Sequence, residues 1–126
     1  MTQLTLDRPG NYNHVRSVGP EGIRIGEDTH GEALILSAET LITDWPPQQL
    51  DAVEESHWEA VLALKPEVVL VGTGKTQHFP HPSLLAPFYR AGVGVEVMTT
   101  EAACRTFNVL ASEDRRVVAA LLPVAD

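Results

Sequence analysis

A short, almost continuously apolar run, Glu67–Val71, constrains the fold of this chain more than any other segment. Runs of this length and composition are typical of strands that are buried on both faces of an α/β sheet. Gly72-Thr73-Gly74 follows directly, and two glycines so close together favour a sharp turn where the strand ends. The run therefore predicts an interior strand with a tight turn at its carboxyl end.

The second half of the chain continues with alternating strands and helices. Val93–Met98 and Arg116–Leu122 have the composition of strands. A helix is expected between them, from Thr99 or Thr100, whose hydroxyl can cap it, to about residue 111. Strand 67–71, a helix and strand 93–98 form a right-handed β-α-β unit, which makes the two strands parallel. We expect these two to be the central strands of the sheet.

Two further helices are predicted on either side of strand 67–71. Ser56-His57-Trp58-Glu59 has the pattern of a capping box, in which the serine and the glutamate satisfy each other's backbone N–H groups, and Pro66 would close that helix. The other helix is expected around Ser83–Ala91. Pro87 would lie either in its first turn or at a kink.

The first half of the chain looks β-rich and antiparallel. An extended piece is expected at His14–Val18, and Gly22–Gly26 and Glu32–Leu36 read as strands joined by a polar hairpin loop, Glu27–Gly31. Glu39–Thr43 is a further strand candidate. The chain is thus predicted to be an α/β layered domain with a central mixed β-sheet, a β-rich antiparallel N-terminal part and two or three helices, and its 126 residues fit a single domain, 1–126.

Charge and hydropathy exclude several classes of partner. Seventeen acidic residues against nine basic ones give a net charge of −8, which disfavours nucleic acids and anionic membrane surfaces. The longest apolar run, Val117–Leu122, has six residues, whereas a membrane-spanning helix needs about 18. Met1–Gly10 shows no pattern of a leader peptide, so we expect a cytoplasmic protein without direct membrane insertion.

No motif in the chain completes a cofactor, metal or catalytic site. A phosphate-binding loop ending in Gly74-Lys75-Thr76 would need a glycine where Val69 stands. His78 and His81 lack a third metal ligand nearby. The single cysteine, Cys104, excludes an internal disulfide and falls on the apolar face of its helix, as a core residue does. The expectation is no cofactor, no metal and no assigned catalytic residue.

A crevice above the glycine turn is nevertheless a candidate ligand site, because ligands of open α/β sheets bind at the carboxyl ends of the strands. Strand alternation puts Glu96 on the face opposite Val95 and Val97, where it would pair with Arg105 or Arg115 or line the crevice. Glu113 with Arg115 or Arg116 is a similar ion-pair candidate. The candidate residues are Gly72, Thr73, Gly74, Glu96, Thr99, Thr100, Arg105, Asn108, Glu113 and Arg115.

The order of short motifs from Leu64 to Pro123 resembles that of a known family. The motifs are Lys65-Pro66-Glu67, Gly72-Thr73-Gly74, Gly94-Val95-Glu96-Val97, Thr100, Ala103, Thr106-Phe107-Asn108, Leu110, Glu113, Arg115 and Ala119-Ala120-Leu121-Leu122-Pro123. They are similar to those of the small α/β domains of unknown function that include mitochondrial complex I assembly factor 3 and an adipogenesis-associated protein. Asp114 stands where that family often has glycine, and aspartate tolerates the left-handed turn that a glycine there would make.

The resemblance implies a central mixed sheet with two or three helices, and it brings no catalytic residues with it. The main functional hypothesis is therefore an interaction or assembly-factor-like protein that has a protein partner and is not an enzyme. The alternative is a small-molecule binder or an undescribed enzyme that uses the crevice above Gly72-Thr73-Gly74. Self-association is a third hypothesis, in which exposed Trp45, Trp58 or Phe79 would form a homodimer interface.

Overall fold

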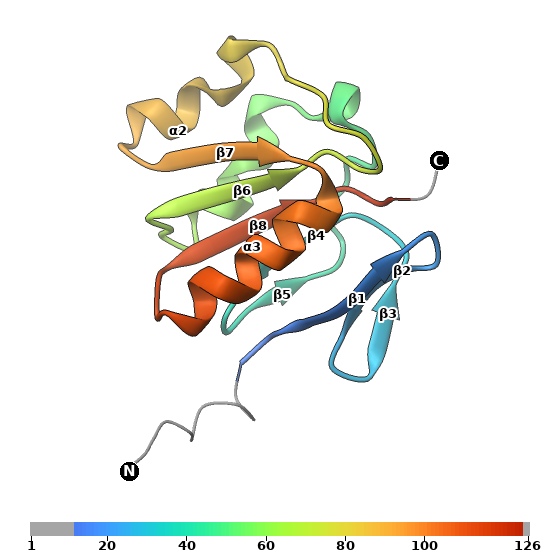
Figure 1. Ribbon diagram of the computed structural model, residues 1–126. Helices are drawn as coiled ribbons and strands as arrows, with labels where there is room; N and C mark the ends of the chain where they lie inside the picture. The colour runs from blue at the N-terminus through green and yellow to red at the C-terminus, as the bar shows by residue number, and fades with distance from the viewer. Residues whose placement is uncertain (1–11, 125–126) are drawn as a thin grey trace.

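The centre of the molecule is a five-stranded mixed sheet (Figure 1). The computed structural model describes residues 12–124, so the expectation about Met1–Gly10 falls outside the described residues. The strands are, in spatial order, β5 (Leu41–Ile42), β4 (Leu34–Ser37), β8 (Val117–Leu121), β6 (Val68–Gly72) and β7 (Gly94–Met98). β6 is parallel to both of its neighbours, whereas β4 is antiparallel to β8. The predicted interior strand, its parallel partner and the mixed sheet are thus confirmed.

The expectation that strand 93–98 is central is wrong, because β7 lies at an edge of the sheet. The central position belongs to β8, whose five residues are all buried. A β-α-β unit makes two strands parallel neighbours, but it does not determine on which side the next strand joins them. Here β8 joins on the far side of β6 and leaves β7 with one open edge.

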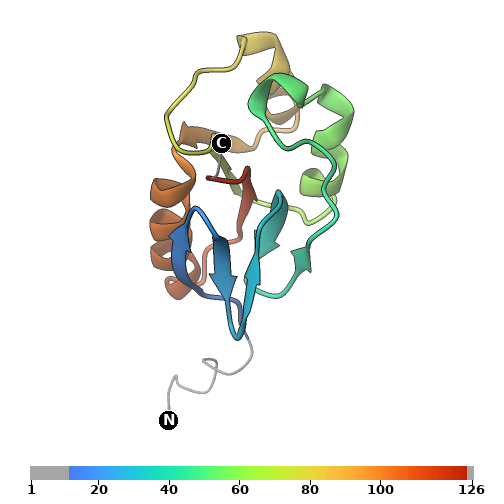
Figure 2. The same ribbon diagram turned by 90° about the vertical axis from the view of Figure 1, so that its right-hand side faces the viewer.

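One face of the sheet is covered by helix α3 (Thr100–Ser112) and by a second, three-stranded antiparallel sheet (Figures 1 and 2). The strands of this second sheet are β1 (Val15–Gly19), β2 (Gly22–Ile25) and β3 (Asp28–His30). Phe107 and Cys104 of α3 pack in one buried cluster with Ile23 of β2 and Leu70 of β6. Burial of these apolar side chains holds the second sheet and the helix to the same face.

The predicted hairpin loop at Glu27–Gly31 is wrong, because this segment contains strand β3. β2 pairs with β3 and not with β4, and the turn between them is only Gly26-Glu27. Gly26 has φ +62°, a left-handed conformation that glycine adopts without steric cost. The polar composition of β3 hid the strand, since polar stretches between strands usually mark loops.

The other face of the sheet is covered by short helices around two tryptophans. The helices are η1 (Leu50–Ala52), η2 (Glu55–Trp58), α1 (Glu59–Leu62), η3 (Pro82–Leu85) and α2 (Ala86–Arg90). The Trp58 ring lies 4.8 Å from that of Phe88, centroid to centroid, and its Nε1 donates to the carbonyl of Leu84 at 2.8 Å. Trp45 is also buried. The expectation of exposed tryptophans is therefore wrong, whereas Phe79 is exposed as expected.

The helices on this face begin at positions that differ from the predicted ones. The capping box uses Glu54 and His57 in place of Ser56 and Glu59, because a 3-10 turn precedes α1 and moves the first free N–H groups toward the N-terminus. Pro87 lies in the first turn of α2, so the helix begins late and is not kinked there. On the opposite face, α3 begins after Thr99, whose hydroxyl accepts from the N–H of Ala102 at 3.1 Å.

Candidate functional site

The carboxyl end of β6 is closed by a direct approach of two backbones. A side chain at Gly72 would put its Cβ 2.9 Å from the Cα of Thr100, so only glycine fits there without a shift. Gly74 has φ +100° and lies against the carbonyl of Pro123. The glycines of the turn are thus required by packing between β6, the start of α3 and the end of β8.

Thr100 seals this end of the sheet with its hydroxyl. Its side chain is fully buried; its Oγ1 accepts from the N–H of Gly74 at 2.8 Å and donates to the carbonyl of Leu122 at 2.7 Å. Thr73 likewise donates its hydroxyl to the carbonyl of Thr76 at 2.7 Å. The polar groups that were candidates for holding a ligand are therefore bonded to the protein's own backbone.

Only half of the candidate residues meet at the glycine turn. Gly72, Thr73, Gly74, Thr99 and Thr100 lie together there. Asn108 lies further along α3, where its side chain accepts from Val15 N–H and donates to Val15 C=O, both at 2.9 Å. This pair of bonds ties α3 to β1, which is a structural role. Arg105, on an outer face of α3, forms an exposed ion pair with Glu101 at 3.6 Å.

The remaining charged candidates do not form the predicted pairs. Arg115 pairs with Glu67 at 3.1 Å, so its expected pairing with Glu96 or Glu113 is wrong. Glu67 also accepts from the N–H of Arg116 at 3.0 Å, and this bond, with the neighbouring arginine side chain, lowers the pKa of the Glu67 carboxyl below 4.5. Among residues 12–124, no ion pair is formed by Glu96, which is exposed on the edge strand.

The left-handed turn after α3 and the buried position of Cys104 are both as predicted. Asp114 adopts the left-handed conformation, with φ +61°. Cys104 is buried, and desolvation raises the pKa of its thiol to about 12. A thiol in this environment is a packing group and not a nucleophile at neutral pH.

The two loop histidines hydrogen-bond with their own loop. His78 bonds with the hydroxyl of Thr76 at 2.8 Å, while His81 caps η3 by accepting from the N–H of Ser83. Within residues 12–124, no group of three or more His, Cys, Asp and Glu side chains is placed to hold a metal ion.

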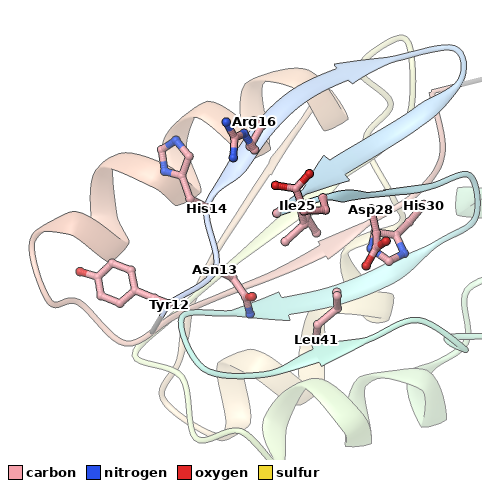
Figure 3. A pocket seen from close by; sticks show the side chains of 10 residues that line it. Tyr12, Asn13, His14, Arg16, Ile25, Asp28, His30 and Leu41 are labelled. Atoms are coloured by element: carbon pink, nitrogen blue, oxygen red, sulfur yellow. The ribbon is translucent and has the colours of Figure 1, made fainter. Parts of the chain in front are cut away.

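A large hollow that no sequence motif indicates lies between the second sheet and β5 (Figure 3). It has a volume of about 880 Å³. The lining residues are Tyr12, Asn13, His14, Arg16, Ile25, Gly26, Glu27, Asp28, His30 and Leu41. The signal for this hollow is the polar strand β3, whose composition is that of a loop.

A second, smaller hollow of about 460 Å³ lies where β8 begins, and Arg115 and Arg116 are on its wall. Both arginines are already bonded there: Arg115 to the Glu67 carboxylate, and Arg116 Nε to the carbonyl of Lys65 at 3.3 Å. Both arginines of this hollow thus have partners within the protein.

The two most exposed aromatic residues of the described chain, Phe79 and Tyr89, lie on segments next to β7. Gln77 Nε2 donates to the outward carbonyl of Val97 at 3.0 Å, which holds the loop after β6 against this edge. Phe79 on that loop is 80% exposed, and Tyr89 on α2, the helix that packs beside β7, is 60% exposed. We call the surface formed by Phe79, Tyr89 and the edge of β7 the β7-edge surface.

Comparison with known families decides the classification of this fold. A family described as "Protein of unknown function (DUF498/DUF598)" matches residues 15–122. The chain belongs to this family. The match includes every strand and helix of the structure, and it bears out the resemblance seen in the motifs between Leu64 and Pro123.

The named relatives of this chain include a membrane protein and an assembly factor. A protein of Francisella tularensis subsp. holarctica named "13 kDa major membrane protein" is 35% identical over 97 residues, which are 75% of this chain and 76% of that protein. The mouse "NADH dehydrogenase [ubiquinone] 1 alpha subcomplex assembly factor 3" is 32% identical over 113 residues. These are 87% of this chain but only 60% of the mouse protein.

A solved structure supports the fold. A crystal structure of a Bordetella parapertussis protein superposes with a TM-score of 0.83 at 40% identity, over 89% of this chain and 96% of that one. Although one relative is called a membrane protein, none of the helices between residues 12 and 124 has the length and apolar character needed to cross a bilayer.

Proposed function

We propose that this protein acts as an assembly-factor-like interaction protein that binds another protein and catalyses no reaction. The observation that carries the proposal is the similarity to the mouse assembly factor over 87% of this chain. The chain spans 60% of that relative's length. The part that this chain shares with the mouse protein is therefore the α/β domain, and we expect the surface that binds a partner to lie on this domain.

The β7-edge surface is the part of the body that suits a protein partner best. Aromatic side chains are enriched at the centres of protein interfaces, and Phe79 and Tyr89 expose theirs. The strand beside them has an open edge with the exposed carboxylate of Glu96 at its middle. Glu96 shares a face of the sheet with Leu70, on the side of α3, so the groups that a partner would bring to Phe79 and Tyr89 are apolar ones.

The alternative, a small-molecule binder or enzyme with a crevice above the glycine turn, has less support. Thr73 and Thr100 already use their hydroxyls on backbone carbonyls, and Asn108 is bound to β1. A ligand there would have to break hydrogen bonds that the fold itself uses.

Affinity capture from the native host, with a matched pair of variants, tests the proposal. A partner should copurify with the wild type through gel filtration in constant proportion. Phe79→Ser combined with Tyr89→Ser should abolish this association, because buried aromatic residues dominate binding energy. Glu101→Ala combined with Arg105→Ala, on an exposed part of α3, should leave it intact. Capture of no partner, or equal capture by both double variants, would refute the proposal.

Two finer expectations stay predictions. A homodimer through Phe79, the exposed one of the three aromatic residues predicted for it, would appear in light scattering as a doubled mass that Phe79→Ser abolishes. A cytoplasmic location is tested by fractionation of the native cell, with the protein expected in the fraction that contains no membranes.

A further inference from the structure

The hollow beside the second sheet holds an arginine that differs from all others in the described chain. Arg24, Arg90, Arg105 and Arg115 each form an ion pair with a glutamate. Arg116 has no ion pair among these, but its Nε donates to the carbonyl of Lys65. Of the arginines within residues 12–124, only Arg16 has neither an ion pair nor a side-chain hydrogen bond.

The backbone places Arg16 at the hollow through an irregularity in β1. The register between β1 and β2 shifts between Val15 and Ser17, so Arg16 has no residue opposite it on β2. Such a bulge re-aims a side chain and is over-represented next to functional sites. Arg16 is consequently part of the wall of the hollow, although Val15 beside it points into the core.

The opposite wall, on β3, carries an acidic group and a histidine. Asp28 lies opposite Ile25 and His30 opposite Ile23, so both point to the same side of the second sheet as these buried isoleucines. Figure 3 shows Asp28, His30 and Ile25 at the hollow. Asp28 has no ion pair in the described chain. Glu27, the other acidic residue of the wall, is already paired with Arg24 at 3.8 Å.

The histidine of this wall, His30, has a buried polar atom. Its Nε2 atom is buried and has no hydrogen-bond partner in the structure. A buried unpaired polar atom is destabilising, and an apolar side chain would serve packing better at this position. Polar residues that break such local rules are expected mainly at functional sites.

Together these features form a hollow with one unpaired cation and one unpaired anion on opposite walls. β1 and β3 both pair with β2, so their backbones are about 10 Å apart, two strand spacings. Arg16 and Asp28 do not reach each other. Between them, the apolar side chains of Ile25 and Leu41 line the hollow.

We propose that this hollow binds a small zwitterion, a molecule with a carboxylate at one end, an ammonium group at the other and a short apolar chain between them. The carboxylate lies against the guanidinium of Arg16, which can bind both of its oxygens. The ammonium group donates to the carboxylate of Asp28. The apolar chain covers Ile25 and Leu41. This site is separate from the β7-edge surface and independent of the protein partner proposed there.

Aminocaproate, which has this pattern of groups, is the probe for a titration followed by amide NMR. Caproate, which lacks the ammonium group, and hexylamine, which lacks the carboxylate, are its controls. Aminocaproate should bind with a dissociation constant at least roughly tenfold below those of both controls, since each end adds a charge-assisted hydrogen bond. The shifted amides should be those of residues 14–16 and 25–30.

Substitutions at the two walls assign the ends of the probe. Arg16→Gln should weaken aminocaproate and caproate alike, by roughly tenfold or more. Asp28→Asn should weaken aminocaproate to the level of caproate while leaving caproate unchanged. Arg105→Gln, which removes the same charge from an exposed part of α3, should have no effect. Both walls are exposed, so the variants should keep the wild-type amide spectrum outside the hollow.

The proposal would be overturned by three results. One is the absence of shifts up to tens of millimolar aminocaproate. Another is equal binding of all three compounds, because an ordinary apolar hollow would not distinguish their end groups. The third is equal loss of affinity in Arg16→Gln and Arg105→Gln, which would mean that the net charge of the protein and not this site governs binding.

Discussion

The carboxyl end of β6 and the hollow beside β3 show opposite uses of polar residues. At the end of β6, the hydroxyl of Thr100 accepts one hydrogen bond and donates another, and both partners are backbone groups. In the hollow, Arg16 and Asp28 have no partner within the described chain, and His30 has a buried nitrogen without one. Polar groups that the fold satisfies are structural, whereas those it leaves unsatisfied are available to a ligand.

The glycine turn at the carboxyl end of β6 has a purely structural role, although it lies where ligands of α/β sheets usually bind. A glycine turn after a parallel strand is where ligands of α/β sheets bind. Here the missing side chain of Gly72 makes room for the backbone of Thr100, so the space that a ligand would need is filled by α3. Substitutions at the carboxyl end of β6 and at the hollow beside β3 test this difference between the two regions.

The largest effect is expected from Thr100→Val, which keeps the shape of the side chain but removes its hydroxyl. The N–H of Gly74 and the carbonyl of Leu122 would both lose their partner in a fully buried position. Each unsatisfied group costs about 1–3 kcal/mol, so the free energy of unfolding should fall by about 3 kcal/mol or more. Urea unfolding followed by circular dichroism measures this change.

Thr43→Val, at an exposed threonine, is the control and should stay within about 0.5 kcal/mol of the wild type. A loss for Thr100→Val as small as that of the control would contradict the sealed end. It would mean that water reaches Gly74 and Leu122, and the crevice above the turn would become the better candidate site.

A smaller loss, about 2 kcal/mol, is expected from Asn108→Ala, because two hydrogen bonds to Val15 disappear together. The effect should be local: β1 forms a wall of the hollow, and Asn108 holds β1 to α3. Hydrogen exchange should therefore accelerate at the Val15 amide before it does in β6. Arg105→Ala, on the same helix, should change neither quantity, and uniform acceleration across all strands would contradict the local role.

The third prediction is an increase in the free energy of unfolding, whereas the first two are decreases. His30→Phe removes the buried unpaired nitrogen from the hollow and keeps a planar ring, so the free energy of unfolding should rise by about 1 kcal/mol. Stabilisation here, against destabilisation at Thr100, would show directly that the two regions use polar residues differently. A loss of stability would instead show that His30 has a bonding partner in solution, such as a bound water, and the hollow would lose one of its supports.

Much of the fold could be predicted from the spacing of apolar residues and from the residues that begin or end helices and strands. The apolar runs at β6 and β8 and the cap at Thr99 gave correct elements, because buried strands and helix starts depend on local composition. Strand order was not accessible in this way. The central place of β8 results from pairing between segments far apart in sequence, and the polar strand β3 is held by hydrogen bonds to β2 and not by its own composition.

The candidate residues were harder to predict than the fold. The pattern placed Thr100 and Asn108 correctly on α3, but it did not show that both bond to backbone from other elements. The bulge at Arg16 and the inward orientation of Asp28 depend on the register between β1, β2 and β3. Register is a property of the assembled sheet, so no short sequence motif predicts which side chains line the hollow.

The smallest effect concerns the arginine that has a partner, Arg115 in the second hollow, and sharpens its contrast with Arg16. The pKa of Glu67 is lowered from 4.5 by its bonds to the Arg116 N–H and the Arg115 side chain. A carboxyl whose pKa is lowered in the folded state stabilises the protein above its unfolded pKa and loses this contribution as the pH falls through the folded value. Glu67→Gln should therefore be slightly less stable than the wild type at neutral pH, and the difference should vanish on acidification below 4.5.

Thermal unfolding at a series of pH values measures this difference, which is small because the pair is exposed to solvent. Arg115→Gln should show a smaller difference of the same sign, since it removes the side-chain partner of Glu67 but leaves the bond to the Arg116 N–H. Arg16→Gln, which breaks no ion pair between residues 12 and 124, should run parallel to the wild type throughout. If instead Arg16→Gln also converged with the wild type in acid, Arg16 would have a carboxylate partner in solution, and the hollow beside β3 would not differ from the second one.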